Sequence, residues 1–202
     1  MNFDEMLFKY FKKEQLDKIK NTKVVIAGCG GLGSNVAVSL VRSGFCHLYL
    51  IDHDYVEISN LNRQAYFYDQ IGLPKVIALK ENLLRINKDI NVLTFQEFIN
   101  RENVYKLLSH GDIIVEAVDD KETKLLLLET AHMLNKKIVM ANGVCGFGDV
   151  EKISIKRFKN TTIIGDFESD NSTIPPYAPK VSVVANMQCD EVLRIVLKDS
   201  NY

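Results

Sequence analysis

The feature that most constrains the fold is a glycine-rich turn between a strand and a helix. The segment KVVIAG (residues 23–28) is a short β-branched run ending in glycine and predicts a buried strand. It leads into GCGGLGS, where Gly28, Gly30 and Gly33 follow the spacing G-x-G-x-x-G. Such glycines allow a tight bend, a close approach of phosphate to the backbone, and packing of helix on strand. A tight turn without a ligand is the alternative. We expect this turn, Gly31 included, to bind a nucleotide phosphate.

Strand and helix patterns alternate through most of the remaining chain. Strands are predicted over residues 47–52, 91–96, 112–118 and 137–143, and helices over 33–43, 72–87 and 122–135. This alternation predicts an α/β fold with a Rossmann-like, doubly wound and mostly parallel sheet. Ahead of it, apolar residues at near-helical spacing with lysines between them predict a surface helix over residues 4–20.

The pattern changes after Gly148. Residues 151–158 and 161–167 alternate like a hairpin, which predicts antiparallel C-terminal strands. A polar, proline-bearing loop over 168–180 and an apolar-faced helix over 181–197 close the chain. We therefore predict one domain over residues 1–202, made of an N-terminal helix (1–20), an ATP-binding core (21–148) and a C-terminal elaboration (149–202). The prediction of ATP as the nucleotide depends on the loop after the second predicted strand.

Polar residues crowd the loop after the second predicted strand. Asp52 ends that strand about twenty residues after the glycine turn, where a ribose-binding carboxylate is expected. Asn60, Arg63 and Gln64 follow, and Lys75 comes at a helix start. A guanidinium and an ammonium beside a glycine turn suit a triphosphate better than a dinucleotide. The alternatives are a solvated loop charge for Arg63 and a surface helix lysine for Lys75.

Two aspartates end the fourth predicted strand, at the edge where such sheets bind ligands. Mg²⁺ prefers carboxylate and phosphate oxygens, so we assign Asp119 to the metal. We assign Asp120 to the N-cap of the following helix.

Composition excludes several other classes. A net charge of −1 gives no global attraction to nucleic acid or an anionic membrane. The N-terminus does not read as a signal peptide, and apolar runs stop short of membrane-spanning length. The four cysteines form no C-x-x-C pair, which argues against zinc and for a reducing, cytoplasmic location.

Several segments together resemble a known superfamily. GCGGLGSNVAVSLVRSG, IDHDYVEISNLNRQAYF, IGLPKVIALKENLLRIN and VEAVDDKETK are similar to the ThiF/MoeB/HesA proteins, relatives of ubiquitin-activating enzymes. The similarity runs from about residue 17 to 197, and S-N-L-x-R-Q is its most specific part. The short length and missing zinc cysteines resemble the ThiF-type sulfur carrier protein adenylyltransferases.

That resemblance implies a reaction, partners and site residues. It implies a homodimer that uses ATP and Mg²⁺ to adenylate the C-terminal glycine carboxylate of a ThiS-like sulfur carrier ending in Gly-Gly, with a separate sulfur donor, in thiamine biosynthesis. Carried over by motif, Asp52 binds the ribose, Asn60, Arg63 and Lys75 the phosphates, Asp119 the Mg²⁺, and Gly28, Gly30 and Gly33 the nucleotide; Gly31 and Gln64 complete the predicted nucleotide site.

The implied reaction needs no general base, because a carboxylate is already ionised at neutral pH. Catalysis then consists of positioning and charge neutralisation, with Arg63, Lys75 and Asp119 as the catalytic residues. The four histidines need no role. Cys145 is the one cysteine placed to react, and we expect the reaction to stop at the acyl-adenylate instead.

The chain departs from the family in two places. Residues 1–20 contain no arginine to reach a partner subunit's ATP, so Lys9, Lys12 or Lys13 is the available substitute. The predicted crossover loop (166–180) contains no cysteine. Three alternatives stay open: activation of another carboxylate, on a modified tRNA base or a peptide; an NAD-dependent oxidoreductase; and a catalytically silent dimeric scaffold.

Overall fold

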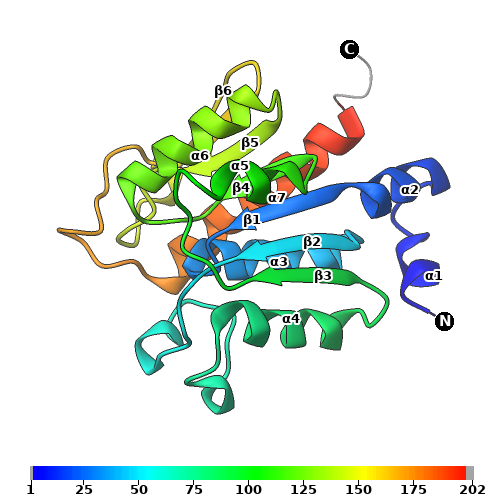
Figure 1. The fold of residues 1–202 in the computed structure, drawn as a ribbon, viewed down its shortest axis with the longest axis horizontal. Coiled ribbons are helices and arrows are strands. Elements are labelled where there is room, and N and C mark those ends of the chain that lie inside the picture. Colours follow the sequence, from blue (N-terminus) through cyan, green and yellow to red (C-terminus); the bar gives the residue numbers. More distant parts are fainter. Residues whose placement is uncertain (1, 199–202) are drawn as a thin grey trace.

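The computed structural model describes residues 2–198. One sheet carries seven strands in the order β3-β2-β1-β4-β5-β7-β6, and every neighbouring pair is parallel except β6 and β7 (Figure 1). The strands are β1 (Lys23–Ala27), β2 (His47–Ile51), β3 (Asn91–Phe95), β4 (Ile113–Glu116), β5 (Lys137–Ala141), β6 (Ser154–Arg157) and β7 (Thr161–Gly165). The predicted mostly parallel α/β fold is confirmed.

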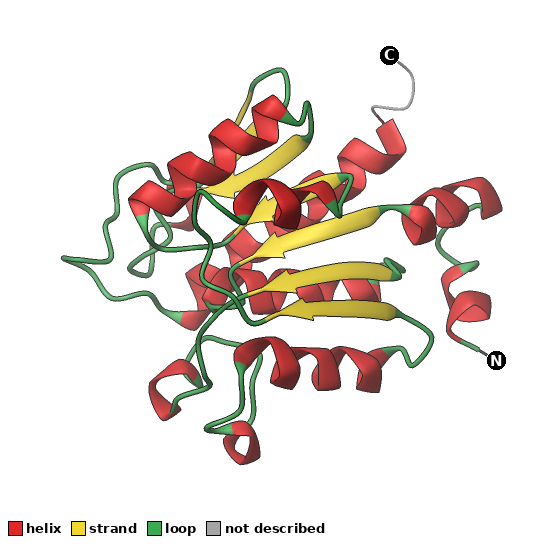
Figure 2. Cartoon of the chain, viewed as in Figure 1, coloured by secondary structure: helices red, strands yellow, loops and turns green. Residues whose placement is uncertain are grey.

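Helices cover both faces of this sheet (Figure 2). On one face lie α3 (Gly31–Arg42), α4 (Lys75–Ile86) and α7 (Ala178–Lys198), with α3 and α7 in extensive contact. On the other lie α5 (Val104–Ser109), which the sequence analysis did not predict, and α6 (Lys121–Met133). Within residues 2–198 no helix combines the length and the hydropathy that crossing a bilayer requires.

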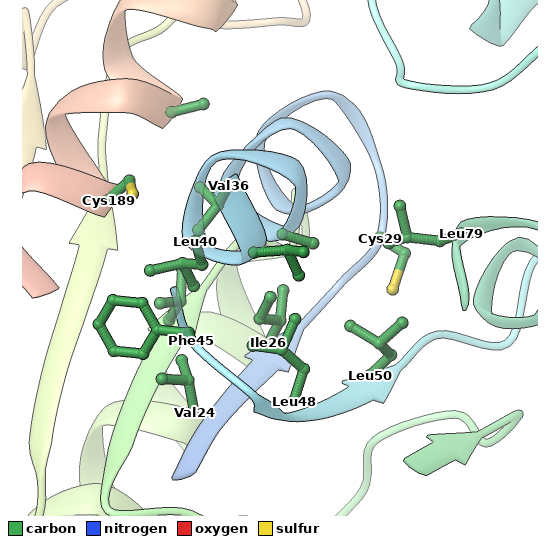
Figure 3. Packing of buried hydrophobic residues seen from close by; sticks show 14 of the residues in the cluster. Val24, Ile26, Cys29, Val36, Leu40, Phe45, Leu48, Leu50, Leu79 and Cys189 are labelled. Atoms are coloured by element: carbon green, nitrogen blue, oxygen red, sulfur yellow. The ribbon is translucent and has the colours of Figure 1, made fainter. Parts of the chain in front are cut away.

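The central strands are buried on both faces. Val24 and Ile26 of β1 point into the cluster beneath α3 and α7 (Figure 3), whereas Val25 and Ala27 join the cluster beneath α5 and α6. A strand covered by helices on both sides must be apolar along its buried length, which explains the unbroken run VVIA after the exposed Lys23. This double burial fixes the carboxyl ends of the strands, and the site lies there.

The N-terminal segment differs from the single helix predicted over residues 4–20. It forms α1 (Phe3–Leu7), capped by Asn2, and α2 (Lys13–Asn21), with a turn between them. A Cβ atom on Gly44 would lie 2.9 Å from Leu7 Cδ1 and 3.1 Å from Leu16 Cδ1. Nine residues of continuous helix rise about 13 Å, so the chain has to bend for both leucines to reach one place in the core.

The C-terminal hairpin exists, but only one of its strands is antiparallel to the sheet. Residues 161–165 form β7, which pairs in parallel with β5, and β6 alone runs the other way at the sheet edge. The closing helix begins at Ala178, three residues before its predicted start at 181. Residue 1 and residues 199–202 of the predicted domain lie outside the described part of the chain.

Candidate functional site

The carboxyl ends of the parallel strands open into a cavity of about 690 Å³. Its lining brings together nearly all of the residues predicted from the sequence: Gly28, Gly30, Gly31, Asp52, Asn60, Arg63, Gln64, Lys75 and Asp119. They come from the ends of β1, β2 and β4, from the starts of α3 and α4, and from the loop between β2 and α4. Gly33 is the exception and lies beneath the turn.

The glycine turn needs glycine for two distinct reasons. Gly28 has φ +95°, and a Cβ atom there would lie 2.5 Å from the Ala117 carbonyl oxygen at the end of β4. A Cβ atom on Gly33 would lie 1.9 Å from the Gly28 carbonyl oxygen. Around Gly30 the space is open, with Gln64 Nε2 the nearest atom at 4.0 Å. The N-terminus of α3 therefore faces free space, as a phosphate requires.

Asp52 is held in place by the backbone around it. Its Oδ2 accepts a hydrogen bond of 2.6 Å from the Cys29 N–H, and its Oδ1 accepts one of 2.8 Å from the Asp54 N–H. A carboxylate has about four acceptor positions. The remaining ones can bind the hydroxyls of a ribose.

The loop after β2 presents Arg63 and Gln64 to the glycine turn. The Arg63 side chain passes over Gly31, with Cγ 3.5 Å from where a Cβ atom would stand. Its Nη1 donates to the Ser59 carbonyl oxygen at 3.2 Å and to Asn62 Oδ1 at 2.8 Å. Gln64 is buried, and among the described residues its Oε1 has no hydrogen-bond partner. An orphaned buried acceptor in the lining is consistent with a polar ligand.

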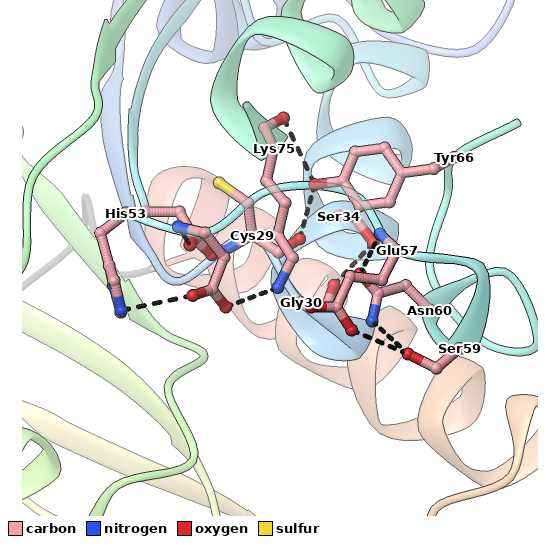
Figure 4. A network of polar contacts seen from close by, with 11 residues as sticks. Cys29, Gly30, Ser34, His53, Glu57, Ser59, Asn60, Tyr66 and Lys75 are labelled. Carbon is pink, nitrogen blue, oxygen red and sulfur yellow. Dashed lines mark hydrogen bonds and ion pairs between the residues drawn. The ribbon is translucent and has the colours of Figure 1, made fainter. Parts of the chain in front are cut away.

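Asn60 is buried at the end of a short 3₁₀ turn, Ile58–Asn60, in the same loop (Figure 4). Its Oδ1 accepts a hydrogen bond of 3.0 Å from the Glu57 N–H, and its Nδ2 lies 3.4 Å from Ser59 Oγ. The carboxamide oxygen thus shapes the loop, while the amide nitrogen is only weakly engaged and remains a donor for a ligand.

Lys75 is a cavity residue, so its reading as a surface helix lysine is wrong. The residue is 6% exposed, and its Nζ donates to Asp54 Oδ2 at 2.7 Å. The Lys75 N–H also donates to the Asp54 carbonyl oxygen at 2.9 Å. His53 Nε2 approaches the other oxygen of the Asp54 carboxylate at 3.3 Å (Figure 4). Asp54 therefore fixes the Lys75 ammonium in the lining of the cavity.

The two aspartates after β4 have different surroundings. Asp120 caps α6, accepting from the Thr123 N–H at 2.7 Å, and this hydrogen bond lowers the pKa of Asp120. The predicted N-cap is confirmed. Asp119 is exposed, lines the cavity, and has no hydrogen bond or ion pair among residues 2–198. A free carboxylate at this position suits a cation, and its assignment to Mg²⁺ stays a prediction.

Several residues of the site were not predicted from the sequence. Tyr66 donates its hydroxyl to the Cys29 carbonyl oxygen at 2.7 Å. Ser34 donates to the Gly30 carbonyl oxygen at 2.7 Å and accepts from the Ala65 N–H at 3.0 Å. Both tie the glycine turn to the loop that carries Arg63 (Figure 4). The serine in GCGGLGS was visible, but its partner lies 31 residues away.

Cys145 lines the far side of the cavity and is 4% exposed. Its N–H donates to Ser169 Oγ at 3.0 Å, which attaches the loop between β7 and α7 to the cavity wall. Burial raises the pKa of the Cys145 thiol. A thiol in this state is a poor nucleophile.

Known proteins of similar sequence and structure are nucleotide enzymes. The sulfur carrier protein ThiS adenylyltransferase of Bacillus subtilis is 37% identical over 131 residues, covering 63% of this chain and 38% of that protein. Escherichia coli MccB, solved with ATP, is 28% identical with a TM-score of 0.71, covering 90% and 57% of the two chains. Escherichia coli TcdA, solved with ATP and described as a tRNA N6-threonylcarbamoyladenosine dehydratase, has a TM-score of 0.88 at 20% identity, covering 97% and 94%. That last likeness is one of fold.

The chain spans less than half the length of the curated relatives it matches. The ThiF family model, in contrast, matches residues 4–202. The glycine turn, Asp52 and the cations of the following loop lie within that match, and the chain belongs to the ThiF family.

Proposed function

We propose that this chain is an ATP-dependent adenylyltransferase acting on the C-terminal glycine carboxylate of a ThiS-like sulfur carrier. The observation that carries the proposal is the convergence of Arg63 and Lys75 with the glycine turn on one cavity. Two cations beside a phosphate-binding turn suit a triphosphate. An NAD-dependent oxidoreductase would have little use for both.

In the proposed reaction, a carboxylate oxygen of the carrier attacks the α-phosphorus of ATP. The bond from that phosphorus to the bridging oxygen breaks, and pyrophosphate leaves with the electron pair. No proton has to move, so the chain needs to supply only position and positive charge. Arg63 and Lys75 would bind the phosphates, and Asp52 the ribose.

Mg²⁺ is the metal proposed for this site. Asp119 would bind it, since its carboxylate is exposed to the cavity and otherwise uncommitted among the described residues. Bound there with the ATP phosphates, Mg²⁺ would neutralise charge on the leaving group.

The rim of the cavity favours a protein substrate over tRNA. Exposed Phe147 and Tyr177, with their rings in edge contact at 5.3 Å, follow closely on Cys145 and Pro176 of the cavity lining. Exposed Ile174 lies 3.4 Å from where a Cβ atom on Gly146 would stand. In the cavity lining six carboxylates outnumber four cationic side chains: Asp52, Asp54, Glu97, Asp119, Asp120 and Asp170 against Arg63, Lys75, Lys121 and Lys124. A polyanion needs a basic surface, whereas an apolar and acidic rim suits a folded carrier or a peptide.

We propose that the enzyme stops at the acyl-adenylate and passes it to a separate sulfur donor. The buried Cys145 thiol, with its raised pKa, supports this. We also propose a homodimer, supported by exposed Phe8 and Tyr10 in the N-terminal segment. A role in thiamine biosynthesis and a cytoplasmic location complete the proposal, the latter supported by four free cysteines.

The decisive experiment is ATP–pyrophosphate exchange with three candidate substrates: a carrier ending in Gly-Gly, a short peptide acid, and tRNA. The matched control is the same carrier with its C-terminus amidated, which removes the nucleophile and keeps the fold. Exchange with the free carrier alone is expected. Exchange that depends on tRNA, or that persists with the amidated carrier, would refute the proposed substrate.

A further inference from the structure

An ion pair joins Lys124, which lines the cavity, to the buried Glu116 behind it, and has no part in the reaction described above. Glu116 ends β4 and is 0% exposed. Lys124, on α6, donates from Nζ to Glu116 Oε1 at 2.7 Å and to the Ala141 carbonyl oxygen at 3.1 Å. The Lys124 side chain is 25% exposed and is part of the cavity lining.

The carboxylate end of this pair is fixed by the backbone. The Val118 N–H donates to Glu116 Oε1 at 2.8 Å, and the Ala141 N–H lies 3.4 Å from Oε2. An ammonium has three donors. Within residues 2–198 two of those of Lys124 are used, by Glu116 and Ala141. The exposed part of the side chain leaves the third donor for a ligand in the cavity.

The position of Lys124 relative to the nucleotide site follows from the strand order. Glu116 ends β4, the neighbour of β1, and Ala141 ends β5, one strand further on. Adjacent strands are about 4.8 Å apart, so the ammonium stands within about 10 Å of the glycine turn. Arg63 and Lys75 belong to the segment that follows β2, which is the neighbour of β1 on the side away from β4, and Lys75 pairs there with Asp54.

An in-line displacement at the α-phosphate needs the nucleophile on the side opposite the leaving group. With the phosphates on the glycine turn at the end of β1, Arg63 and Lys75 would bind them from the β2 side, and Lys124 would stand on the β4 side. We propose that Lys124, held by Glu116 and the Ala141 carbonyl group, binds the carboxylate of the substrate and aligns it for attack. This inference rests on the proposed adenylyltransferase function.

The test compares variants that keep the fold. Lys124→Gln alone would leave Glu116 buried without its cation, which is destabilising. The double variant Glu116→Gln, Lys124→Gln removes both charges, and Lys124→Arg keeps them. Lys106→Gln is the control, because Lys106 lies on the neighbouring helix α5, is exposed, and is not part of the cavity lining.

The measurement is ATP–pyrophosphate exchange with the carrier, with KM determined for both substrates. Loss of a charge-assisted hydrogen bond predicts a carrier KM about 10- to 100-fold higher in the double variant, with the KM for ATP within about twofold of wild type. Lys124→Arg should retain much of the carrier affinity, and Lys106→Gln all of it. An unchanged carrier KM, or an equal rise in the KM for ATP, would overturn the inference.

A second measurement separates this inference from the proposed function. With ¹⁵N-labelled lysine and a non-hydrolysable ATP analogue bound, glycylglycine should shift the Lys124 signal, and glycylglycinamide should not. A shift without carrier-dependent exchange by the wild type would refute the carrier and keep the role of Lys124. Normal exchange without a shift would refute the role of Lys124 and keep the carrier.

Discussion

Removing the Tyr66 hydroxyl tests whether the glycine turn is held from the loop side. Tyr66 is 6% exposed, and the Cys29 carbonyl oxygen that accepts its hydrogen bond belongs to a residue that is 0% exposed. Burial raises the pKa of Tyr66 far above its usual range, so the hydroxyl stays a donor at any working pH. Tyr66→Phe keeps the ring and deletes only that donor.

The expected loss is that of a buried hydrogen bond whose acceptor is left unpaired, about 1–3 kcal/mol in the free energy of unfolding. For a chain of this size each 1 kcal/mol lowers Tm by about 2–4 °C. A fall of about 2–12 °C is therefore expected. Since Cys29 lies inside the glycine turn, affinity for ATP should fall as well.

Tyr49→Phe is the matched control. Tyr49 is also buried, at 8% exposure, and its hydroxyl has no hydrogen bond among the described residues. It lies on β2 and stacks on His110. Urea unfolding followed by circular dichroism, with calorimetric titration of ATP, compares the two variants. If Tyr66→Phe is no more destabilising than Tyr49→Phe, the hydrogen bond does not hold the turn.

Four further changes have defined outcomes. Asp119→Asn should lower the rate of ATP–pyrophosphate exchange at least about 100-fold, as when a charge in the transition state loses its partner. Tm should not change, because the side chain is exposed. Exchange at the normal rate would rule out the metal role. Lys75→Met should weaken ATP binding in calorimetry, and equal affinity contradicts its phosphate role. Glu191 is buried, and although burial opposes it, hydrogen bonds from Arg157 and Arg194 lower the pKa of Glu191 from 4.5 to about 2. Its contribution to stability is therefore complete above pH 4.5 and is lost as pH falls towards 2, so the stability of Glu191→Gln should vary less over that window in acid unfolding. Mass spectrometry of a mixture of enzyme, carrier and ATP–Mg²⁺ should detect no covalent adduct between enzyme and carrier. An adduct that forms with the wild type and disappears in Cys145→Ser would refute the non-covalent route.

The sequence was sufficient for those parts of the site that depend on local pattern. A glycine turn between a strand and a helix is a local arrangement, and Gly28 and Gly33 proved to need glycine for contacts within that unit and with β4. The position of Asp52 could be predicted for the same reason, because it directly follows the second predicted strand in the sequence. The parallel sheet then brings these ends to one edge.

Parts that depend on packing were harder to predict. The predicted helix over residues 4–20 had suitable spacing throughout, and only the shared contact of Leu7 and Leu16 with Gly44 explains its bend. Similarly, the alternation in residues 161–165 does not distinguish a strand that pairs with β5 from one that pairs only with β6. Alternation reports which side chains are buried and is silent about the neighbouring strand.

Lys121 and Lys124 show how much the sequence leaves undetermined. Both lie near the start of α6 in DDKETK, and three residues along a helix rotate the side chain by about 300°, which leaves the two only about 60° apart. The Lys121 side chain is 89% exposed and pairs with Asp170, whereas Lys124 pairs with the buried Glu116. What separates them is the buried carboxylate at the end of β4, eight residues earlier in the chain. In sequence VEAVDD presents three acidic residues, and only the fold determines that one is buried, one caps a helix and one faces the cavity. The sequence therefore indicates which lysine faces a buried carboxylate only once the strand that carries that carboxylate is known.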